Sequence, residues 1–256
     1  MAEPLLAIKG LNKHYGGVVA TQDLYLDVLA GEVHAIIGPN GAGKTTLIGE
    51  LSGTVEPDSG AITFAGVDIT SLAAPARSLL GMARTFQITS LFMEFTALDN
   101  VALAVQAHDG PSFGMWDAAR IDEALRGPAR EALQRVGLET RADVPAGNLS
   151  HGEHRQLEIA MALATQPKML LLDEPTAGMG TEQSRRMVAL LAKLKGAVTI
   201  LLIEHDMDAV FALADRITVL SYGRAIATGR PEEIRADAKV REAYLGDDAG
   251  IGGGGA

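Results

Sequence analysis

A glycine-rich stretch from Gly38 to Thr46 is the part of the sequence whose residue types and spacing indicate chemistry most clearly. It reads Gly-Pro-Asn-Gly-Ala-Gly-Lys-Thr-Thr and matches the pattern Gly-x-x-x-x-Gly-Lys-[Ser/Thr]. Glycines let backbone N–H groups approach phosphate oxygens closely, the lysine supplies a mobile positive charge, and the threonine hydroxyl can bind Mg²⁺. The stretch therefore predicts a site for a nucleoside triphosphate and Mg²⁺. The predicted nucleotide-binding residues are Gly38, Pro39, Asn40, Gly41, Ala42, Gly43, Lys44, Thr45 and Thr46.

The residues on either side of this phosphate loop favour the same interpretation. Val33–Ile37 is a short apolar run typical of a buried parallel strand, and residues 44–52 are helix-forming. Phosphates would then lie at a helix N-terminus, which favours anions. A loop that only connects a strand to a helix does not require Lys44 and two threonines, of which Thr45 is the expected Mg²⁺ ligand.

Two acidic residues follow a second apolar run. Lys168 to Leu172 leads directly into Asp173 and Glu174. Considered alone, this pair indicates a solvated strand end. Because Mg²⁺ on a triphosphate needs hard oxygen ligands, we expect Asp173 to bind the ion through water. Glu174 is then suited to polarise the water that attacks the terminal phosphate.

A histidine follows a third apolar run, Val198–Ile203, in the sequence Glu204-His205-Asp206. A lone histidine is most often structural or exposed at the surface. In an open α/β sheet, however, ligands collect at the carboxyl ends of the strands. We therefore expect His205 to contact the γ-phosphate.

The sequence Ser150-His151-Gly152-Glu153 opens a helix. Ser150 and Glu153 have the spacing of a capping box, and a structural cap alone would explain them. Gly152 weakens a helix by about 1 kcal/mol relative to alanine, so it indicates close approach of the backbone to another group, and a helix N-terminus favours an anion. His151 and His154 lie one turn apart, but the sequence offers no third ligand for a metal.

Tyr15 precedes Gly16-Gly17, near the start of the chain. The segment alone favours an ordinary aromatic residue in a turn. Its position ahead of the phosphate loop also allows a second interpretation, in which the ring stacks on a nucleotide base.

Composition limits the class of protein. The chain has 256 residues, of which 47% are hydrophobic and 21% charged, and this is typical of a globular protein. It has no cysteine, and its net charge of −10 argues against a large nucleic-acid interface. No apolar run approaches the roughly 20 residues of a membrane span, and no secretory signal is visible. We expect a cytoplasmic protein that reaches a membrane only through a partner and binds no nucleic acid.

The remaining patterns predict β-rich segments around an α/β core. Alternation favours short strands at 5–8, 17–20 and 24–29, and a hairpin at 61–69 around Ala65-Gly66. Residues 71–80 are expected to be helical. A short strand from Met82 should end at the amide of Gln87.

From 88 to 165 the pattern becomes helical, and we predict a helical subdomain inserted in the core of one domain, 1–245. Thr96 and Asp99 resemble a cap, and residues 117–136 should form a helix that breaks at Gly127-Pro128. A helix at 182–195 follows, with Thr181 as its cap. The glycine-rich tail, 246–256, is expected to be disordered.

Taken together, these motifs resemble the ATP-binding subunit of an ABC transporter over nearly the whole chain. The matches are the phosphate loop, Gln87, Leu149 to Glu153, Leu170 to Glu174, and His205, in this order. The phrases Ala83-Arg84-Thr85-Phe86-Gln87, Ile203-Glu204-His205-Asp206-Met207 and Ala243-Tyr244-Leu245-Gly246 resemble the LivG branch of branched-chain amino acid importers.

The resemblance implies a fold, a reaction and partners. The fold is a P-loop NTPase core with an N-terminal antiparallel β subdomain and an inserted α-helical subdomain. The reaction is ATP hydrolysis, in which Tyr15 stacks on adenine, Thr45 and Gln87 bind Mg²⁺, Glu174 orients water and His205 senses the γ-phosphate. Residues 150–153 would contact the ATP of a second ATPase subunit, which in this branch is a different, LivF-like chain. Integral membrane permease subunits on the inner membrane, and indirectly a periplasmic solute-binding protein, complete the implied complex.

The sequence departs from the commonest family pattern at two places. His151 and Glu153 stand where Gly and Gln are usual, and the capping argument predicts little loss from this. Gly180 stands where many members have an aspartate, which bears on communication between the two ATP sites. The open alternatives are an ABC ATPase for another cargo, such as urea, amides, aromatic acids or lipopolysaccharide, and a soluble ABC ATPase without a transport role.

Overall fold

The computed structural model describes residues 3–85, 91–109 and 118–245. The chain forms two compact units, one made of Met1–Ala74 and Lys195–Ala256 and the other of Pro75–Leu194. Gln87 and the predicted disordered tail, 246–256, lie outside the described residues. Within the described part of the chain, no helix is both long enough and apolar enough to cross a membrane.

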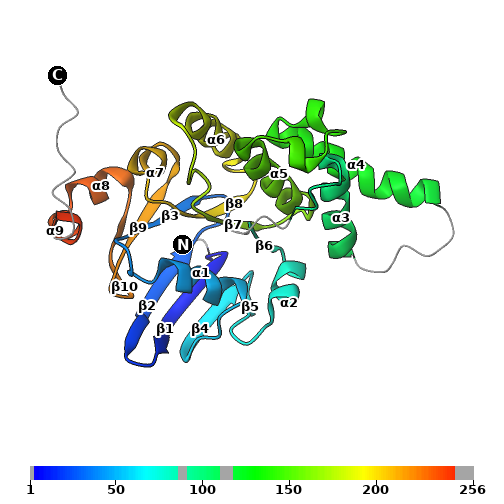
Figure 1. Ribbon diagram of the computed structural model, residues 1–256. Coiled ribbons are helices and arrows are strands. Elements are labelled where there is room, and N and C mark those ends of the chain that lie inside the picture. The colour runs from blue at the N-terminus through cyan, green and yellow to red at the C-terminus, as the bar shows by residue number, and fades with distance from the viewer. Residues whose placement is uncertain (1–2, 86–90, 110–117, 246–256) are drawn as a thin grey trace, which may run out of the picture. The chain divides into compact units, whose positions relative to one another are not determined.

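An antiparallel sheet forms the start of the first unit (Figure 1). Its strands follow in the order β2-β1-β4-β5. The strands are β1 (Leu6–Tyr15), β2 (Val18–Val28), β4 (Ser59–Phe64) and β5 (Val67–Asp68). The last two form the predicted hairpin, and Ala65 and Gly66 both have positive φ at its turn, as a two-residue hairpin loop requires.

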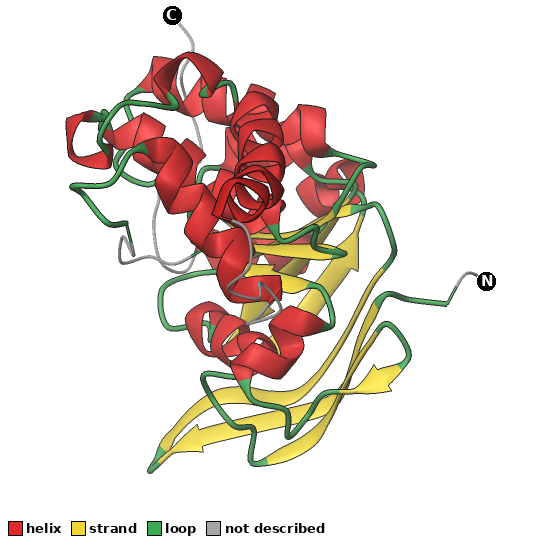
Figure 2. Ribbon diagram, turned by 90° about the vertical axis from the view of Figure 1, so that its right-hand side faces the viewer, coloured by secondary structure: helices red, strands yellow, loops and turns green. Residues whose placement is uncertain are grey.

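The three short runs expected before residue 30 are two long strands, so that prediction was wrong in its number of elements. Asp23, at φ 45°, lies inside β2, and the pairing of β1 with β2 shifts register at three places. Bulges of this kind bend a strand without ending it, and the long strands of this sheet are visibly curved in Figure 2. The predicted alternation is confirmed, since Leu24, Leu26 and Val28 are buried.

The core of the first unit is built on a mostly parallel sheet. In this sheet β10, β9, β3 and β8 are neighbours in this order. The strands are β3 (Val33–Ile37), β8 (Thr199–Ile203), β9 (Arg216–Ser221) and β10 (Arg224–Gly229). Every residue of β3 and β8 is buried, which explains their continuous apolar sequence. The predicted parallel strand before the phosphate loop is therefore confirmed.

Helices cover this sheet in the first unit. They are α1 (Lys44–Ser52), α7 (Met207–Leu213), α8 (Pro231–Ala236) and α9 (Ala238–Leu245). Ile234 from α8 and Val240 from α9 belong to the same buried cluster as Ala35 and Ile37 of β3. The C-terminal helices therefore complete the hydrophobic core beneath the strand that carries the phosphate loop.

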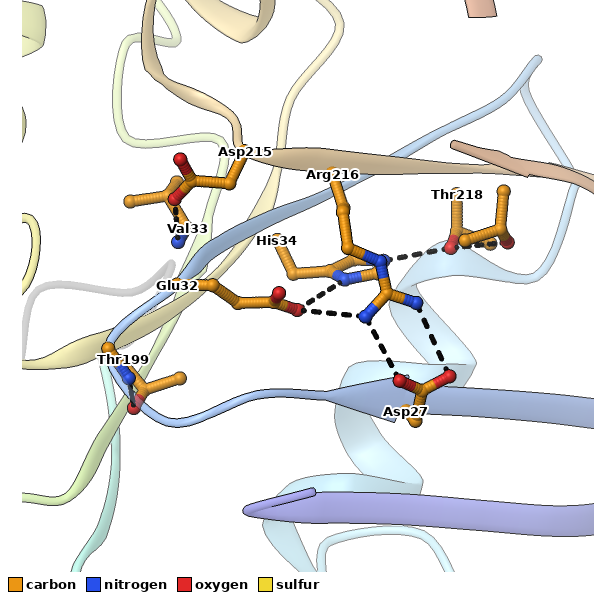
Figure 3. Close-up of polar contacts among 10 residues, drawn as sticks. Asp27, Glu32, Val33, His34, Thr199, Asp215, Arg216 and Thr218 are labelled. Atoms are coloured by element: carbon orange, nitrogen blue, oxygen red, sulfur yellow. Dashed lines mark hydrogen bonds and ion pairs between the residues drawn. The ribbon is translucent and has the colours of Figure 1, made fainter. Parts of the chain in front are cut away.

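A polar network links β2 of the antiparallel sheet to β3 and β9 (Figure 3). Arg216 donates hydrogen bonds of 2.9 and 3.3 Å to the carboxylate of Asp27, and its guanidinium lies 3.6 Å from Oε1 of Glu32. The buried ring of His34 contacts that same Oε1 at 2.9 Å and the hydroxyl of Thr218 at 2.8 Å. The polar groups of His34 are thus paired inside the core, as burial requires.

The second unit contains helices α2 to α6 and two parallel strands. The strands are β6 (Met82–Arg84) and β7 (Met169–Asp173). The helices are α2 (Ala74–Leu79), α3 (Ala97–Asp109), α4 (Ala118–Val136), α5 (His151–Ala164) and α6 (Thr181–Leu194), with 3₁₀ turns η1 (Glu139–Arg141) and η2 (Ala146–Asn148). Thr96 caps α3 as expected, because its Oγ1 accepts from the N–H of Asp99 at 3.0 Å.

The break predicted at Gly127-Pro128 was wrong, because α4 runs through both residues. Proline removes one backbone hydrogen bond of a helix, but packing can offset this loss. Ala129, Leu133 and Val136, which follow the proline, are buried, and α4 contacts α3 and α5. The apolar face of α4 therefore continues across the proline.

Candidate nucleotide site

The phosphate loop connects the end of β3 to the start of α1, and its backbone lies close to two other segments. A Cβ added to Gly38 would collide with the carbonyl oxygen of Leu220, and one added to Gly43 would collide with that of Ala20. Gly43 also has φ 100°, a value that favours glycine. Glycine is therefore required at both positions by the packing of the loop itself.

The loop presents groups that fit a polyphosphate and Mg²⁺. Nζ of Lys44 donates to the carbonyl oxygens of Gly38 at 2.6 Å and Pro39 at 3.0 Å, so the ammonium group lies over the loop. The N-terminus of α1 has no side-chain cap and no acidic residue in its first turn, which suits an anion. Thr45 is exposed beside it, and a hydroxyl is a suitable Mg²⁺ ligand.

A turn between β9 and β10 is hydrogen-bonded to the phosphate loop. The N–H of Gly223 donates to the carbonyl of Ala42 at 3.0 Å, and its own carbonyl accepts from the N–H of Gln22 at 2.8 Å. Tyr222 and Gly223 have positive φ in this turn. This support is not visible in the sequence, because a turn signal does not reveal which distant segment the turn contacts.

His205 lies at the same edge of the sheet as the start of the phosphate loop. Ile36 of β3 is paired in register with Ile203 of β8, so the two strands end side by side. The side chain of His205 is 65% exposed. The expected location beside the loop strand is therefore confirmed, and its contact with a phosphate stays a prediction.

Two carboxylates hold the backbone around this histidine. Glu204 is buried, and its Oε2 accepts hydrogen bonds from the N–H groups of His205 at 3.0 Å and Asp206 at 3.4 Å. Asp206 in turn caps α7 by accepting from the N–H groups of Asp208 and Ala209. The segment from β8 to α7 is thus fixed by side-chain bonds that sequence reasoning did not assign.

Tyr15 ends β1 with its ring 51% exposed. Nζ of Lys13 lies 5.6 Å from the ring centroid and donates to Asp58 at 2.8 Å. This hydrogen bond is the main cause that lowers the pKa of the Asp58 carboxyl. The same bond raises the pKa of Lys13. An exposed ring next to a fixed cation has the surface that base stacking needs.

In the second unit, Asp173 is the last residue of β7 and Glu174 follows it, as expected, but Asp173 is not a solvated strand end. It is only 4% exposed, and its Oδ2 lies 3.5 Å from the guanidinium of Arg84. Glu174 has φ 48°, a left-handed conformation that is uncommon for a residue other than glycine and costs free energy. The buried carboxylate of Asp173 suits a water bound to Mg²⁺. The carboxylate of Glu174, whose backbone is strained, suits the attacking water.

The capping box at the start of α5 is confirmed. Oγ of Ser150 accepts from the N–H of Glu153 at 3.3 Å, and Oε2 of Glu153 accepts from the N–H of Ser150 at 2.8 Å. Nε of Arg141 donates to the other oxygen, Oε1, at 2.8 Å. Burial raises the pKa of the Glu153 carboxyl, but the bonds from Ser150 and Arg141 outweigh it and lower the pKa overall.

Gly152 and the two histidines near the start of α5 have ordinary surroundings. A Cβ on Gly152 would meet only Gln183, at 3.7 Å, so packing in the described chain does not itself require glycine there. Nε2 of His151 lies 3.5 Å from the carbonyl of Ala177, and Nε2 of His154 lies 2.7 Å from that of Ala146. Among the described residues, no group of three or more His, Asp or Glu side chains could hold a metal ion.

Glu50 is another buried acid, and the sequence patterns did not single it out. It lies on α1, is fully buried, and its Oε1 accepts a hydrogen bond of 3.2 Å from Thr21. Burial raises the pKa of Glu50 to about 7. A glutamate on the buried face of the phosphate-loop helix could have been noticed from its spacing with Leu47 and Leu51.

Comparison with known proteins assigns the chain to a family. The family model described as "ABC transporter" matches residues 21–177, more than half of the chain. The chain therefore belongs to the ABC transporter family, as an ATP-binding subunit. A second model, "Branched-chain amino acid ATP-binding cassette transporter", matches residues 226–250.

Individual relatives agree with this assignment. The high-affinity branched-chain amino acid transport ATP-binding protein LivG of Salmonella typhimurium is 40% identical over 256 residues, covering 96% of this chain and 100% of LivG. BraF of Pseudomonas aeruginosa, which carries the same description, is 39% identical over 258 residues, with coverage of 96% and 100%. The predicted resemblance to the LivG branch is confirmed.

Solved structures show the same fold. The ATP-binding cassette MJ1267 in its ADP conformation has a TM-score of 0.82 and 32% identity, covering 96% of this chain and 100% of that chain. A nucleotide-free ATP-binding cassette of an ABC transporter also has a TM-score of 0.82 and 32% identity, with coverage of 94% and 99%. The predicted fold class, that of an ABC ATPase, is confirmed.

Proposed function

We propose that this chain hydrolyses ATP and that hydrolysis drives the uptake of branched-chain amino acids through a membrane importer. The observation that carries the proposal is the full-length similarity to LivG and BraF, together with the C-terminal match at 226–250. The C-terminal match weighs most for the cargo, because the phosphate loop is shared by NTPases of many functions.

The phosphate loop binds the ATP phosphates, and Tyr15 stacks on the adenine. Lys44 contacts the terminal phosphates, and Thr45 with Gln87 binds Mg²⁺, which Asp173 holds through water. Support comes from the uncapped N-terminus of α1 and from the ammonium group over the loop. Bound Mg²⁺ would neutralise charge on the phosphates during transfer.

Glu174 and His205 act on the terminal phosphate. The carboxylate of Glu174 orients water for attack, and the ring of His205 contacts the γ-phosphate. Support for Glu174 comes from its strained backbone. Support for His205 comes from its position at the sheet edge where β3, the strand before the phosphate loop, also ends. Positioned groups of this kind account for most of the acceleration in phosphoryl transfer.

A second, LivF-like ATPase subunit completes each site. Residues 150–153 contact ATP held by that subunit, through the N-terminus of α5 that Ser150 and Glu153 stabilise. The bond from Arg141 to Glu153 helps to hold this helix start in place, and His151 beside it is exposed. The two ATP sites of such a pair are unequal, because each combines different chains.

A permease segment docks on the second unit beside α3. Phe92, Met93 and Phe95 are exposed there, and the rings of Phe92 and Phe95 lie 5.4 Å apart. A pocket of about 330 Å³ adjoins them, lined in part by Phe95, Leu103 and Leu125. Three exposed large apolar side chains within four residues favour an interaction site over a free surface.

Through its permease, the chain lies on the cytoplasmic face of the inner membrane, and a periplasmic solute-binding protein delivers the cargo.

The test is reconstitution in liposomes with candidate permease subunits and a LivF-like partner. Leucine, isoleucine and valine, with a solute-binding protein, should stimulate ATP hydrolysis, while urea, amides and aromatic acids should not. Stimulation by one of the latter instead would reassign the cargo. If the chain co-purifies with no integral membrane protein and its hydrolysis needs none, the soluble alternative is correct.

A further inference from the structure

We infer that Glu204 is a positioning residue for His205, which it holds through the backbone and through the ring. This inference rests on the proposed function of His205 as the contact to the γ-phosphate. It assigns a role to a residue outside the phosphate loop, the Mg²⁺ ligands and the attacking-water site.

The geometry around Glu204 separates it from a carboxylate at a solvated strand end. The residue is 1% exposed, although it directly follows the last residue of β8. Its Oε2 accepts from the N–H of His205 at 3.0 Å and lies 3.9 Å from Nδ1 of the same histidine. One carboxylate oxygen therefore faces both the main chain and the ring of one residue.

Burial of this charge has a cost that the fold must offset. A buried carboxylate is stable only where hydrogen bonds or an opposite charge compensate for lost hydration. A neutral side chain would suffice to tie the loop to the strand, because a hydroxyl or an amide also accepts from N–H groups. The negative charge adds an attraction to the imidazole, whose Nδ1 lies 3.9 Å from Oε2.

The arrangement decides which ring nitrogen meets the nucleotide. Because Nδ1 lies on the side of Glu204, at 3.9 Å, Nε2 is the nitrogen that a γ-phosphate oxygen would contact. A carboxylate at this distance favours one ring orientation by electrostatic attraction, a weaker form of the hydrogen-bonded carboxylate–histidine pair of hydrolytic triads. Loss of the charge should therefore reduce turnover while leaving ATP binding, which depends on the phosphate loop, unchanged.

The experiment compares Glu204→Gln with wild type in the assembled transporter. Glutamine keeps an oxygen acceptor for the two N–H groups and removes the charge. We expect kcat to fall at least about tenfold while KM for ATP changes less than about twofold. In a His205→Ala background, the same substitution should change kcat less than about twofold, because its target is gone. Asp206→Asn is the matched control, since Asp206 binds backbone N–H groups of the same segment but caps α7.

A second readout does not depend on transport. The chain has six histidines, so ring signals in NMR spectra of the full chain can be assigned by loss of one signal in His205→Ala. Glu204→Gln should shift the His205 ring signals and leave those of His151 and His154 in place. Glu204→Asp keeps the charge and should recover most of the kcat. If Glu204→Gln does not fold, Glu204→Thr removes the charge, keeps a hydroxyl acceptor and takes its place.

Two results would overturn the inference. Unchanged kcat and ring signals in Glu204→Gln would show that the charge does not reach His205. An equal loss of kcat with and without His205 would show that Glu204 only stabilises the loop. If instead the wild-type complex shows no solute-stimulated hydrolysis while the ring signals shift as expected, the proposed function fails and the contact between the two residues stands.

Discussion

The hydroxyl of Thr21 donates a hydrogen bond of 3.2 Å to Oε1 of Glu50, and both side chains are fully buried. Thr21 lies on β2 and Glu50 on α1, so the bond joins the antiparallel sheet to the helix that begins at the phosphate loop. Burial raises the pKa of Glu50 from its ordinary value of 4.5 to about 7. The protonated acid is therefore the form that the folded chain favours near and below neutral pH.

Stability should depend on pH through this residue. Between pH 4.5 and about 7 the unfolded chain loses the proton of Glu50 while the folded chain keeps it, so the free energy of unfolding falls as pH rises. Glu50→Gln removes this dependence. After allowance for screening by solvent, we expect the variant to be more stable than wild type by about 2 kcal/mol at pH 8 and nearly equal at pH 4.5.

Urea denaturation across this pH range measures the effect. Glu56→Gln, at an exposed glutamate of the same region, is the control and should leave the curve unchanged. Parallel pH curves for wild type and Glu50→Gln would contradict this prediction, because they would show that the pKa of Glu50 is the same in the folded and the unfolded chain.

Glu174→Gln should abolish turnover and preserve ATP binding. The amide cannot orient water as a carboxylate does, so we expect hydrolysis to fall by about two to four orders of magnitude. Phosphate release measures hydrolysis, and a fluorescent ATP analogue measures binding. Glu182→Gln, at an exposed glutamate paired with Arg186, is the control. Undiminished turnover in Glu174→Gln would remove Glu174 from the mechanism.

Glu153→Gln should separate two roles of the capping box. It introduces the residue commonest in the family, keeps an acceptor for the N–H of Ser150 and loses the ion pair with Arg141. Because that pair is partly exposed, we expect a loss of only about 0.5 kcal/mol in the free energy of unfolding and no change in hydrolysis. Arg141→Gln should give the same loss, and the double variant should lose no more than either. Additive losses would show that the ion pair contributes nothing.

Two helical glycines should respond in opposite ways to alanine. A Cβ on Gly127 of α4 would meet only Oε1 of Glu123, at 3.9 Å, so Gly127→Ala should stabilise the chain by about 0.5–1 kcal/mol. A Cβ on Gly49 of α1 would lie 2.6 Å from Cγ2 of Val55, so Gly49→Ala should destabilise it. Urea midpoints for the two variants test both. A stabilising Gly49→Ala would show that Val55 moves aside at no cost.

Local motifs in the sequence predicted the phosphate loop, the capping box and the buried strands. Each of these depends on residues within about ten positions, where spacing and propensity carry the information. The continuity of α4 across Pro128 could not be predicted in this way, because packing of Leu133 and Val136 against other helices decides it. The same holds for Glu204, whose burial and bonds to the following backbone are visible only once β8 is placed in the sheet.

The position of β3 between β8 and β9 has a consequence for biosynthesis. The strand that ends at the phosphate loop finds its neighbours only after residues 199–221 have been made, and its core is closed by Ile234 and Val240. The first unit is also discontinuous, since residues 75–194 are made between its two parts. Pairing over such long sequence separations is slow and leaves apolar strands uncovered meanwhile. A nascent chain therefore has the complete ATP-binding motif long before it has a loop that can bind ATP, and nucleotide can stabilise the fold only after residues 199–240 have been made.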